Sequence, residues 1–293
     1  RGIPPTNLTE LDPRNPLADA DVLYLPYCDG SLFSGDAAID EDGDGTPDRI
    51  HRGLANLSAA LAVGFERFPA PSRIVLAGSS GGGFGTILAV FLVRYVYPDV
   101  PIFVLNDAGV GVAHPDDPMF VSGLIDEFGA RSFLPADCPD CIVDGNITGL
   151  VDYALDHDPN LRVATMSSHY DFIVADVFLG LTAEAFQAAL VEETGALHAE
   201  HPDTYRRFLF SGDAHTALLG GITGLVGSDL GDVELPPDAT TLLTSLTLES
   251  IHTARANDVL LLDWIVAGLG GDAAVWADVV DDPGPLPDWA TTP

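Results

Sequence analysis

The stretch Arg73–Tyr95, RIVLAGSSGGGFGTILAVFLVRY, decides the fold expected of this chain. An apolar run leads into two serines and three consecutive glycines, and a second apolar run follows. Residues 78–82, GSSGG, match the pattern G-x-S-x-G, in which a serine occupies a sharp turn between a strand and a helix. The flanking runs predict a strand over Arg73–Gly78 and a helix over Phe84–Tyr97, so the required context is present on both sides.

The glycines of this turn have a steric reason. Strand and helix approach each other closely, and glycine two residues before and after the serine avoids Cβ clashes. Ser80 would lie at the helix N-terminus, where free N–H groups favour developing negative charge. A phosphate-binding loop would need Lys-Ser/Thr after the glycines, and Gly81, Gly83 and Gly85 lack the G-x-G-x-x-G spacing of dinucleotide sites. A plain strand–helix turn is the remaining alternative.

Strand-like and helix-like runs alternate on both sides of this turn. Such alternation implies crossover connections, an α/β class and a mostly parallel central sheet flanked by helices. We expect one α/β-hydrolase-type domain over residues 1–293, in which 109–160 breaks the rhythm as a lid or binding insertion. Strands are predicted over Asp21–Tyr27, Arg73–Gly78, Val100–Asp107, Leu161–Ser168 and Tyr205–Asp213, and helices over Gly53–Phe68, Phe84–Tyr97, Thr182–His201 and within Glu249–Gly271.

A serine nucleophile needs a base and a group that orients the base. In the α/β-hydrolase arrangement these follow in the chain order Ser, Asp or Glu, His, each after a later strand. Asp171 lies just past the predicted strand over 161–168, and His215 lies just past the strand over 205–213. The sequence therefore predicts that His215 takes the proton of Ser80 while Asp171 fixes the imidazole tautomer.

Both partners have rivals. Asp176 is the alternative acid, but it falls inside the apolar run that follows the strand. His252 precedes the terminal helix and is the main rival base, whereas His169 precedes Asp171 and so has the wrong order. Eight histidines are present and aspartate is abundant, so an ordinary surface role is the alternative for each.

The charge balance excludes some partners. The formal net charge is −32, and all twelve basic residues are arginines. So acidic a surface repels nucleic acid and anionic membranes and favours cations. Either a high-salt habitat or simple solubility accounts for it. No apolar run reaches the roughly 18 residues of a membrane span, and the longest, Phe84–Val93, ends at Arg94.

The loop Asp40–Asp48, DEDGDGTPD, has the spacing of a calcium ligand set. Asp40, Asp42 and Asp44 occupy positions 1, 3 and 5 of an EF-hand-type loop, the Thr46 carbonyl position 7 and Asp48 position 9. Position 12 is a histidine, not the bidentate glutamate, so the EF-hand is incomplete. We expect a structural Ca²⁺ here, and a solvated acidic turn is the alternative.

Three cysteines are present, Cys28, Cys138 and Cys141. The closely spaced pair in DCPDC, with a turn-forming proline between, predicts a local disulfide if the protein is secreted. A metal site is disfavoured because no second cysteine pair completes four ligands. The chain begins at Arg1 without a visible signal segment, so we expect a secreted protein whose signal peptide has been removed.

These residues together resemble the pectin acetylesterase/Notum family of serine esterases. The stretches VLYLPYCDGSLFSGD (22–36), HRGLANLSAAL (51–61) and GSSGGGFG (78–85) carry the resemblance, and SSHYDFIVADVF (167–178) and FSGDAHTALL (210–219) are weaker matches. The resemblance extends from about residue 15 to about residue 220 and implies an α/β-hydrolase fold. It implies removal of acyl groups from a polysaccharide or a lipidated protein, with Ser80 as nucleophile, Asp171 as acid and His215 as base.

The chain departs from the family pattern upstream of the Pro-Tyr-Cys segment. The family has a Gly-rich strand end there, which forms one wall of the oxyanion hole, and the chain as given starts after it. Gly81 N–H, next after the nucleophile, supplies one donor. The second donor and the partner of Cys28 are left unassigned.

We therefore expect a secreted serine carboxylic-ester hydrolase, most simply a carbohydrate deacetylase that needs no cofactor for catalysis. Its partners would be an ester substrate, small or polysaccharide, and a calcium ion. Hydrolysis of polyester or lipid esters is the alternative within the same chemistry. A calcium-dependent binding protein on an inactive hydrolase scaffold is the alternative from another class.

Overall fold

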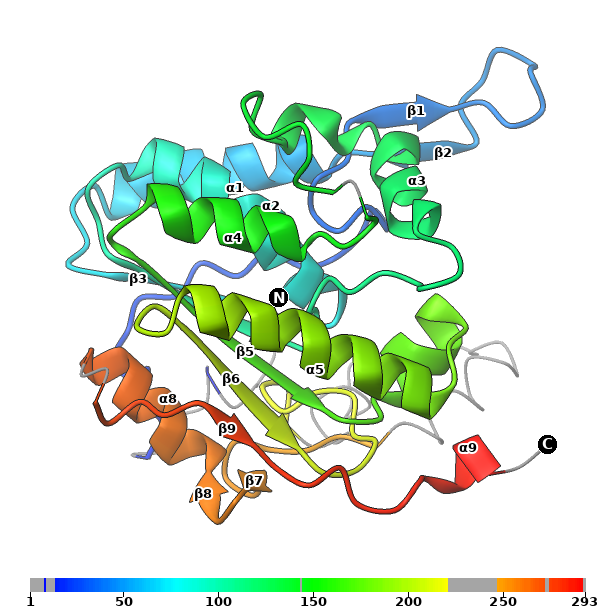
Figure 1. Ribbon diagram of the computed structural model, residues 1–293. Helices are drawn as coiled ribbons and strands as arrows, with labels where there is room; N and C mark the ends of the chain where they lie inside the picture. The colour runs from blue at the N-terminus through cyan, green and yellow to red at the C-terminus, as the bar shows by residue number, and fades with distance from the viewer. Residues whose placement is uncertain (1–7, 9–13, 143, 221–246, 272–273, 292–293) are drawn as a thin grey trace, which may run out of the picture.

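A computed structural model describes residues 8, 14–142, 144–220, 247–271 and 274–291. Its centre is a five-stranded sheet in the order β3-β4-β5-β6-β9, in which every neighbouring pair is parallel (Figure 1). The α/β class and the parallel sheet predicted from the sequence are confirmed. The strands are β3 (Ile74–Ser79), β4 (Ile102–Asp107), β5 (Leu161–Ser168), β6 (Tyr205–Phe210) and β9 (Val279–Val280).

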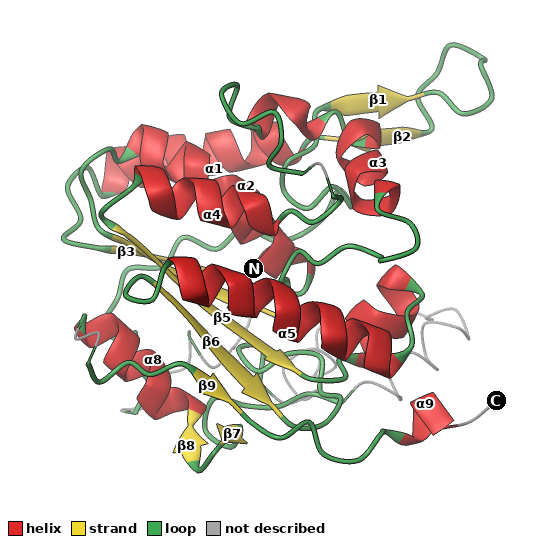
Figure 2. Ribbon diagram, in the orientation of Figure 1, coloured by secondary structure: helices red, strands yellow, loops and turns green. Residues whose placement is uncertain are grey.

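Helices flank this sheet, and two small antiparallel pairs lie outside it (Figure 2). The pairs are β1 (Ala37–Ile39) with β2 (Arg49–His51), and β7 (Arg255–Ala256) with β8 (Val259–Leu260). The helices are α1 (Gly53–Arg67), α2 (Gly81–Val96), α3 (Met119–Glu127), α4 (Thr148–His157), α5 (Ala183–Glu200), α8 (Leu261–Gly270) and α9 (Asp288–Thr291), with a 3₁₀ turn η1 (Ala130–Phe133) and a π-helix η2 (Ile173–Leu179).

The period-2 alternation of the strands divides the core between the two faces of the sheet. In β4, Ile102 and Val104 belong to the cluster that also holds the buried residues of α1, α2, α4 and α5. Phe103 and Leu105 point the other way, into a cluster with α8. All six residues of β4 are buried, as expected for a central parallel strand covered on both faces.

The strand predicted over Asp21–Tyr27 was wrong. The segment forms no strand, and Val22, Leu23, Tyr24 and Tyr27 are each 42–45% exposed. Apolar content alone does not make a strand, because a strand also needs a neighbour to take its hydrogen bonds. Within the described residues β3 ends the sheet on this side, and Leu23 packs instead near Gly64 of α1.

The segment 109–160 contains two kinds of structure. Its last helix, α4, buries Leu150, Val151 and Leu155 in the same core as α2 and α5, as a crossover helix does. The departure from the layered pattern is the earlier part, with α3, η1 and the turn around residue 140. In Figure 1 this part lies beside the β1–β2 hairpin, which projects from the body.

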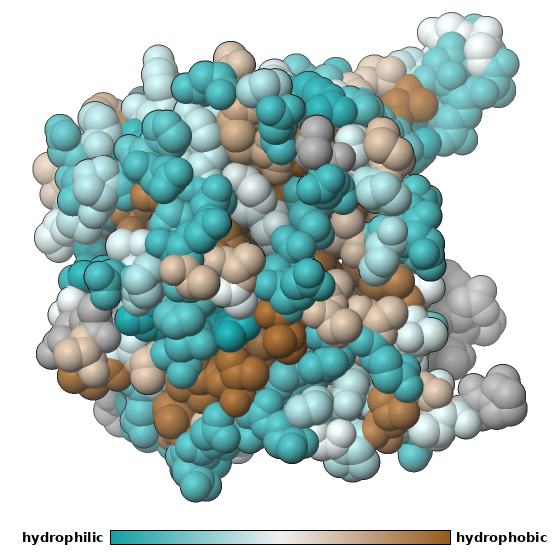
Figure 3. Space-filling view, in the orientation of Figure 1, coloured by the Kyte–Doolittle hydropathy of each residue, from teal (hydrophilic) through white to brown (hydrophobic). Residues whose placement is uncertain are grey.

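No described helix is by itself long and apolar enough to cross a membrane, although η2 and α5, bent by 109° at their junction, would pass together on length and composition. Hydrophilic side chains cover most of the face seen in Figure 3, including the projecting hairpin, while apolar residues gather in small patches.

Candidate active site

Ser80 occupies a strained turn between β3 and α2. Its φ of 56° and ψ of −122° are unusual for a residue with a Cβ, and such strain persists only where the surroundings fix it. Two hydrogen bonds do so, from Ser80 N to Asp107 O at 2.8 Å and from Phe84 N to Ser80 O at 3.1 Å. The serine is half-buried and stands at the N-terminus of α2, where the first backbone N–H groups lack helical partners.

The glycines around the serine are sterically required at two points. A Cβ on Gly78 would lie 2.1 Å from the carbonyl oxygen of Gly82, so strand and helix could not approach as they do. A Cβ on Gly83 would lie 2.8 Å from Asp107 O and from Gly109 Cα. A Cβ on Gly82 would meet only Phe33 at 3.8 Å, which is ordinary contact.

Asp171 and His215 form a buried pair. His215 Nδ1 lies 2.9 and 3.0 Å from the two carboxylate oxygens of Asp171. Asp171 is fully buried and His215 is 7% exposed, and each follows the carboxyl end of a strand, β5 or β6. Burial raises the pKa of Asp171, and the charge and hydrogen bond of His215 oppose that rise. Such a carboxylate can fix the tautomer of the imidazole and stabilise its protonated form.

The rival residues lie elsewhere. Asp176 is exposed on η2, and His169 Nε2 faces Asp281 O at 3.0 Å. His252 is in the turn before β7. The structure therefore brings Asp171 and His215 together and fixes Ser80 separately; among the described residues no hydrogen bond joins Ser80 Oγ to the imidazole.

Asp107 connects the turn of Ser80 to the loop that carries His215. The sequence analysis did not identify this residue. Its carboxylate accepts hydrogen bonds from Ser79 Oγ at 2.7 Å, from Leu218 N at 2.9 Å and from Ala217 N at 3.1 Å. Ser79 precedes the candidate nucleophile, and Ala217 lies two residues after the candidate base. The clue in the sequence was a polar Asn-Asp pair closing the otherwise apolar strand VPIFVLND.

The environment of Asp107 is unusual for a carboxylate. The residue is 1% exposed, and burial raises its pKa from 3.8 to about 6, while the hydrogen bonds from Leu218, Ser79 and Ala217 and the charge of His215 hold it down. A buried group with so perturbed a pKa, held between two catalytic candidates, is typical of a functional site.

The Pro-Tyr-Cys segment covers the start of α2. A Cβ added to Gly81 would lie 3.0 Å from the ring of Tyr27, which stacks on Phe33 with ring centroids 4.9 Å apart. Leu32 N donates to Tyr27 Oη at 3.0 Å. Leu32 and Phe33 both have positive φ, 53° and 62°, so strain is concentrated beside the candidate oxyanion donor Gly81. No second donor is assigned.

The three cysteines differ in whether they form a disulfide. Cys138 and Cys141 are joined in a disulfide, with Cα atoms 5.5 Å apart. Cys28 is exposed and free of any disulfide in the described part of the chain.

The acidic loop forms the tip of the β1–β2 hairpin. One carboxylate oxygen from each of Asp40, Asp42 and Asp44 can lie within 4.8 Å of the others. The Asp40 carboxylate accepts Gly43 N and Gly45 N, both at 2.8 Å, so the loop curls around it. Those three side chains fit the first ligand positions of a calcium loop.

The residues at positions 7, 9 and 12 of the loop make different kinds of contact. Thr46 N donates to Asp44 Oδ1 at 2.7 Å, and Asp48 Oδ2 accepts Glu41 N at 2.8 Å. His51, at position 12, is buried on β2 and its Nδ1 lies 2.9 Å from Asp29 O, so it points away from the loop.

A second group of potential ligands has no local sequence signal. Asp152 on α4 meets Glu200 and His201 at the end of α5, with one ligand atom from each within 4.8 Å of the others. His201 Nε2 lies 2.7 Å from Asp152 Oδ1, and the neighbouring Asp152 carboxylate raises the pKa of Glu200.

A parallel sheet with a serine on a tight strand–helix turn, and an aspartate–histidine pair after two later strands, defines the α/β-hydrolase class. Within that class, the family model described as Pectinacetylesterase matches residues 9–120, the part that contains the Pro-Tyr-Cys segment and the serine turn. Over residues 9–120 this match agrees with the resemblance to the pectin acetylesterase family, and it supports the broad assignment to esterases.

Among solved structures, the Wnt deacylase Notum from Drosophila is similar in fold. In one crystal form the match has 14% sequence identity and a TM-score of 0.56, and covers 88% of this chain and 70% of the other. A second crystal form gives 18% identity and a TM-score of 0.46 over 77% of this chain and 69% of the other. No curated protein matches the sequence.

Proposed function

We propose that this protein is a serine carboxylic-ester hydrolase that removes acetyl or other short acyl groups from a carbohydrate. The observation that carries the proposal is the buried Asp171–His215 pair, tied through Asp107 to the strained turn of Ser80. Together with the match to the pectinacetylesterase model, this arrangement supports acyl transfer to a serine.

In the proposed mechanism Ser80 Oγ attacks the ester carbonyl and His215 takes its proton. The imidazolium then donates that proton to the leaving alcohol, while the Asp171 carboxylate stabilises its charge. Gly81 N–H, at the unpaired start of α2, stabilises the oxyanion. Water, activated by the same imidazole, releases the acid and restores the serine. None of these steps needs a metal.

Ser80→Ala tests the proposal. We expect esterase turnover to fall by several orders of magnitude, since removing the serine cost about 10⁶-fold in an unrelated hydrolase. The melting temperature should hold because Ser80 is half-buried and its fixing contacts are backbone groups. A fluorophosphonate should label the parent chain and not the variant. Retention of esterase activity within about tenfold would exclude Ser80 as nucleophile; an inert Ser80 in the parent would favour the binding protein on an inactive scaffold.

Lipid or polyester hydrolysis is a second candidate, favoured by exposed apolar side chains beside the acid loop. Met119 is 60% and Val177 49% exposed, and the adjacent Phe120 and Phe178 pack together with centroids 5.5 Å apart. Rates on p-nitrophenyl esters of increasing chain length separate the candidates: a steady rise with length supports the lipid ester, and a maximum at acetate supports the deacetylase.

We further propose that Asp40, Asp42 and Asp44, with the Thr46 carbonyl and Asp48, bind one structural Ca²⁺. Three converging carboxylates repel one another without a cation, so a bound ion should order the hairpin tip. Calcium at a hundredfold excess over its Kd should raise the free energy of unfolding by about 2.7 kcal/mol.

The calcium proposal is tested by melting with calcium and with chelator, using Asp42→Ala/Asp44→Ala as the variant. We expect chelation to lower the melting temperature of the parent and to leave that of the variant unchanged. Identical melting of the parent under both conditions would identify the loop as a solvated acidic turn.

We also propose that the protein is secreted. The Cys138–Cys141 disulfide supports this, since such bonds persist in oxidising compartments.

A further inference from the structure

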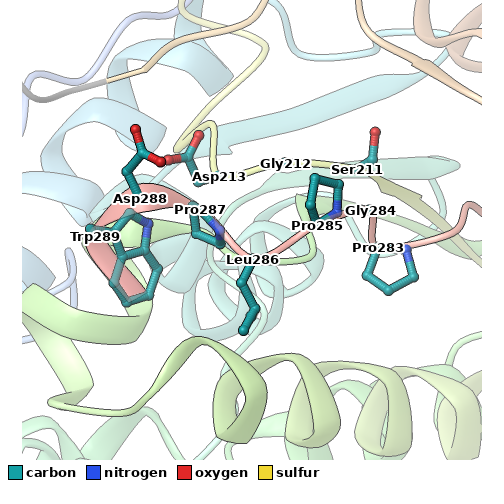
Figure 4. Close-up of a pocket in the computed structure, with 10 residues that line it drawn as sticks. All are labelled: Ser211, Gly212, Asp213, Pro283, Gly284, Pro285, Leu286, Pro287, Asp288 and Trp289. Atoms are coloured by element: carbon teal, nitrogen blue, oxygen red, sulfur yellow. The ribbon is translucent and has the colours of Figure 1, made fainter. Parts of the chain in front are cut away.

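A cavity of about 560 Å³ opens beyond the carboxyl end of β6. One wall is Ser211–Asp213, and the other is the proline-rich segment 283–289 (Figure 4). Hydrogen bonds fix the second wall: Gly284 O accepts from Tyr170 Oη at 3.3 Å, and Asp281 N donates to Leu209 O at 2.9 Å. The cavity is therefore a feature of the folded body.

Both walls continue into the loops of the candidate acid and base. Asp213 lies two residues before His215 on the same connection from β6. The ring of Trp289 packs on Phe172, with centroids 5.3 Å apart, and Phe172 follows Asp171 in the chain. The cavity therefore adjoins the loops that carry the candidate acid and base.

The lining has the chemistry of a sugar site. Trp289, Leu286 and three prolines present apolar surface, whereas Asp213, Asp288 and Ser211 present oxygen atoms. In Figure 4 the two aspartates lie at the same end of the cavity as the indole. A pyranose ring has C–H faces for apolar contact and hydroxyls that donate to carboxylates, so it matches both parts. The volume also lies within the range of small-ligand pockets.

The same lining disfavours a sugar that carries its own carboxylate. None of the ten lining residues that the structure describes is Arg, Lys or His, so a uronate would meet no cationic side chain among them. It would meet the carboxylates of Asp213 and Asp288 in a chain of formal net charge −32. An acyl chain also fits poorly, because it would desolvate the Asp213 carboxylate without offering it a hydrogen bond.

We propose that this cavity is a subsite for a neutral, hydroxyl-rich sugar unit of the ester substrate, and that it discriminates against uronate units. The proposal rests on the proposed esterase function and names the class of alcohol that the enzyme prefers. It separates this chain from an esterase built for an anionic polysaccharide.

The test compares three acetyl esters: an acetylated xylo-oligosaccharide, an acetylated oligogalacturonide of equal length, and p-nitrophenyl acetate. We expect the neutral oligosaccharide to be preferred over the anionic one at low salt, with the difference shrinking as salt rises. Trp289→Ala should lower kcat/KM for the neutral oligosaccharide about tenfold more than for p-nitrophenyl acetate, since it removes an aromatic platform. Tyr95→Ala, an exposed aromatic on α2, is the matched control and should change neither rate.

Binding of the unesterified oligosaccharides to Ser80→Ala, measured by calorimetry, needs no turnover and so separates this proposal from the proposed function. We expect the xylo-oligosaccharide to bind and the oligogalacturonide to bind more weakly or not at all. Equal binding of the two at low salt, or equal effects of Trp289→Ala on oligosaccharide and p-nitrophenyl acetate, would overturn the proposal. So would a gain with octanoate esters that Trp289→Ala abolishes, because the cavity would then be an acyl pocket.

Discussion

Asp107→Asn should separate activity from stability. Near pH 7 the ionised carboxylate costs the fold free energy: its rise in pKa from 3.8 to about 6 corresponds to about 3 kcal/mol. Asparagine removes that cost. Its amide oxygen can take the place of Oδ2 and accept from Ser79 Oγ and Leu218 N, but its NH₂ group then faces Ala217 N in place of the acceptor Oδ1, and an unpaired buried donor costs about 1–3 kcal/mol. The two effects offset each other, so stability near pH 7 should change little.

The catalytic rate of Asp107→Asn should nevertheless fall. Because an N–H donor replaces the Oδ1 acceptor that Ala217 N contacts, the loop that carries His215 is displaced from the strand beside Ser80, and misplacement of about 1 Å can cost about 10²-fold. We expect kcat on p-nitrophenyl acetate to fall by about that factor. Asp278→Asn is the control, because that carboxylate also accepts a backbone N–H and a side-chain N–H, both from Arg207, on β6 before its carboxyl end.

The pH dependence of stability isolates the charge of Asp107. Because the folded-state pKa is raised, this group stabilises the fold fully below pH 3.8, and that contribution is lost as pH rises through about 6. The parent should therefore lose about 2 kcal/mol relative to Asp107→Asn between pH 4 and pH 7, measured by urea unfolding. A difference that stays flat across this range, or a kcat equal to that of the control, would refute the reasoning.

Three further outcomes are expected. Gly78→Ala should lower both the melting temperature and the rate, because its Cβ would lie 2.1 Å from Gly82 O; unchanged melting would show that the turn can relax. Cys138→Ser should lower the melting temperature under oxidising conditions while sparing kcat, and an equal effect under reducing conditions would implicate packing instead. His252→Ala should keep the rate that His215→Ala loses, and the reverse result in the same ester assay would exchange the two as base.

The predictable parts of the fold were those with local signals. The strand 161–168 was predicted to the residue, and α5 agrees within one residue at each end, because apolar runs with clear turn residues define both. Strand β9 was not predicted, because it has only two residues and is too short to show an alternation of apolar and polar side chains. Helix α2 begins three residues before its predicted start, because the glycines of the serine turn are themselves helical.

Two residues of the candidate site could be predicted because each directly follows a strand that the sequence also predicts. Asp171 and His215 could be chosen by chain order, and the structure places them in hydrogen-bond contact. Asp107 could not be chosen, because its role depends on partners distant in the sequence, Ser79 and Ala217. The cavity beside Trp289 could not be predicted for the same reason, because its two walls are distant in the sequence and meet only in the folded chain.

The all-parallel sheet has a consequence for how activity appears during folding. Every neighbouring pair of its strands is joined by a long crossover, so each pairing must close a large loop before it gains contacts. Ser80 follows β3 and His215 follows β6, so the candidate site exists only when β4 and β5 stand between them. Esterase activity should therefore return late in refolding, after helical signals have recovered, and should report the completed sheet more faithfully than circular dichroism does.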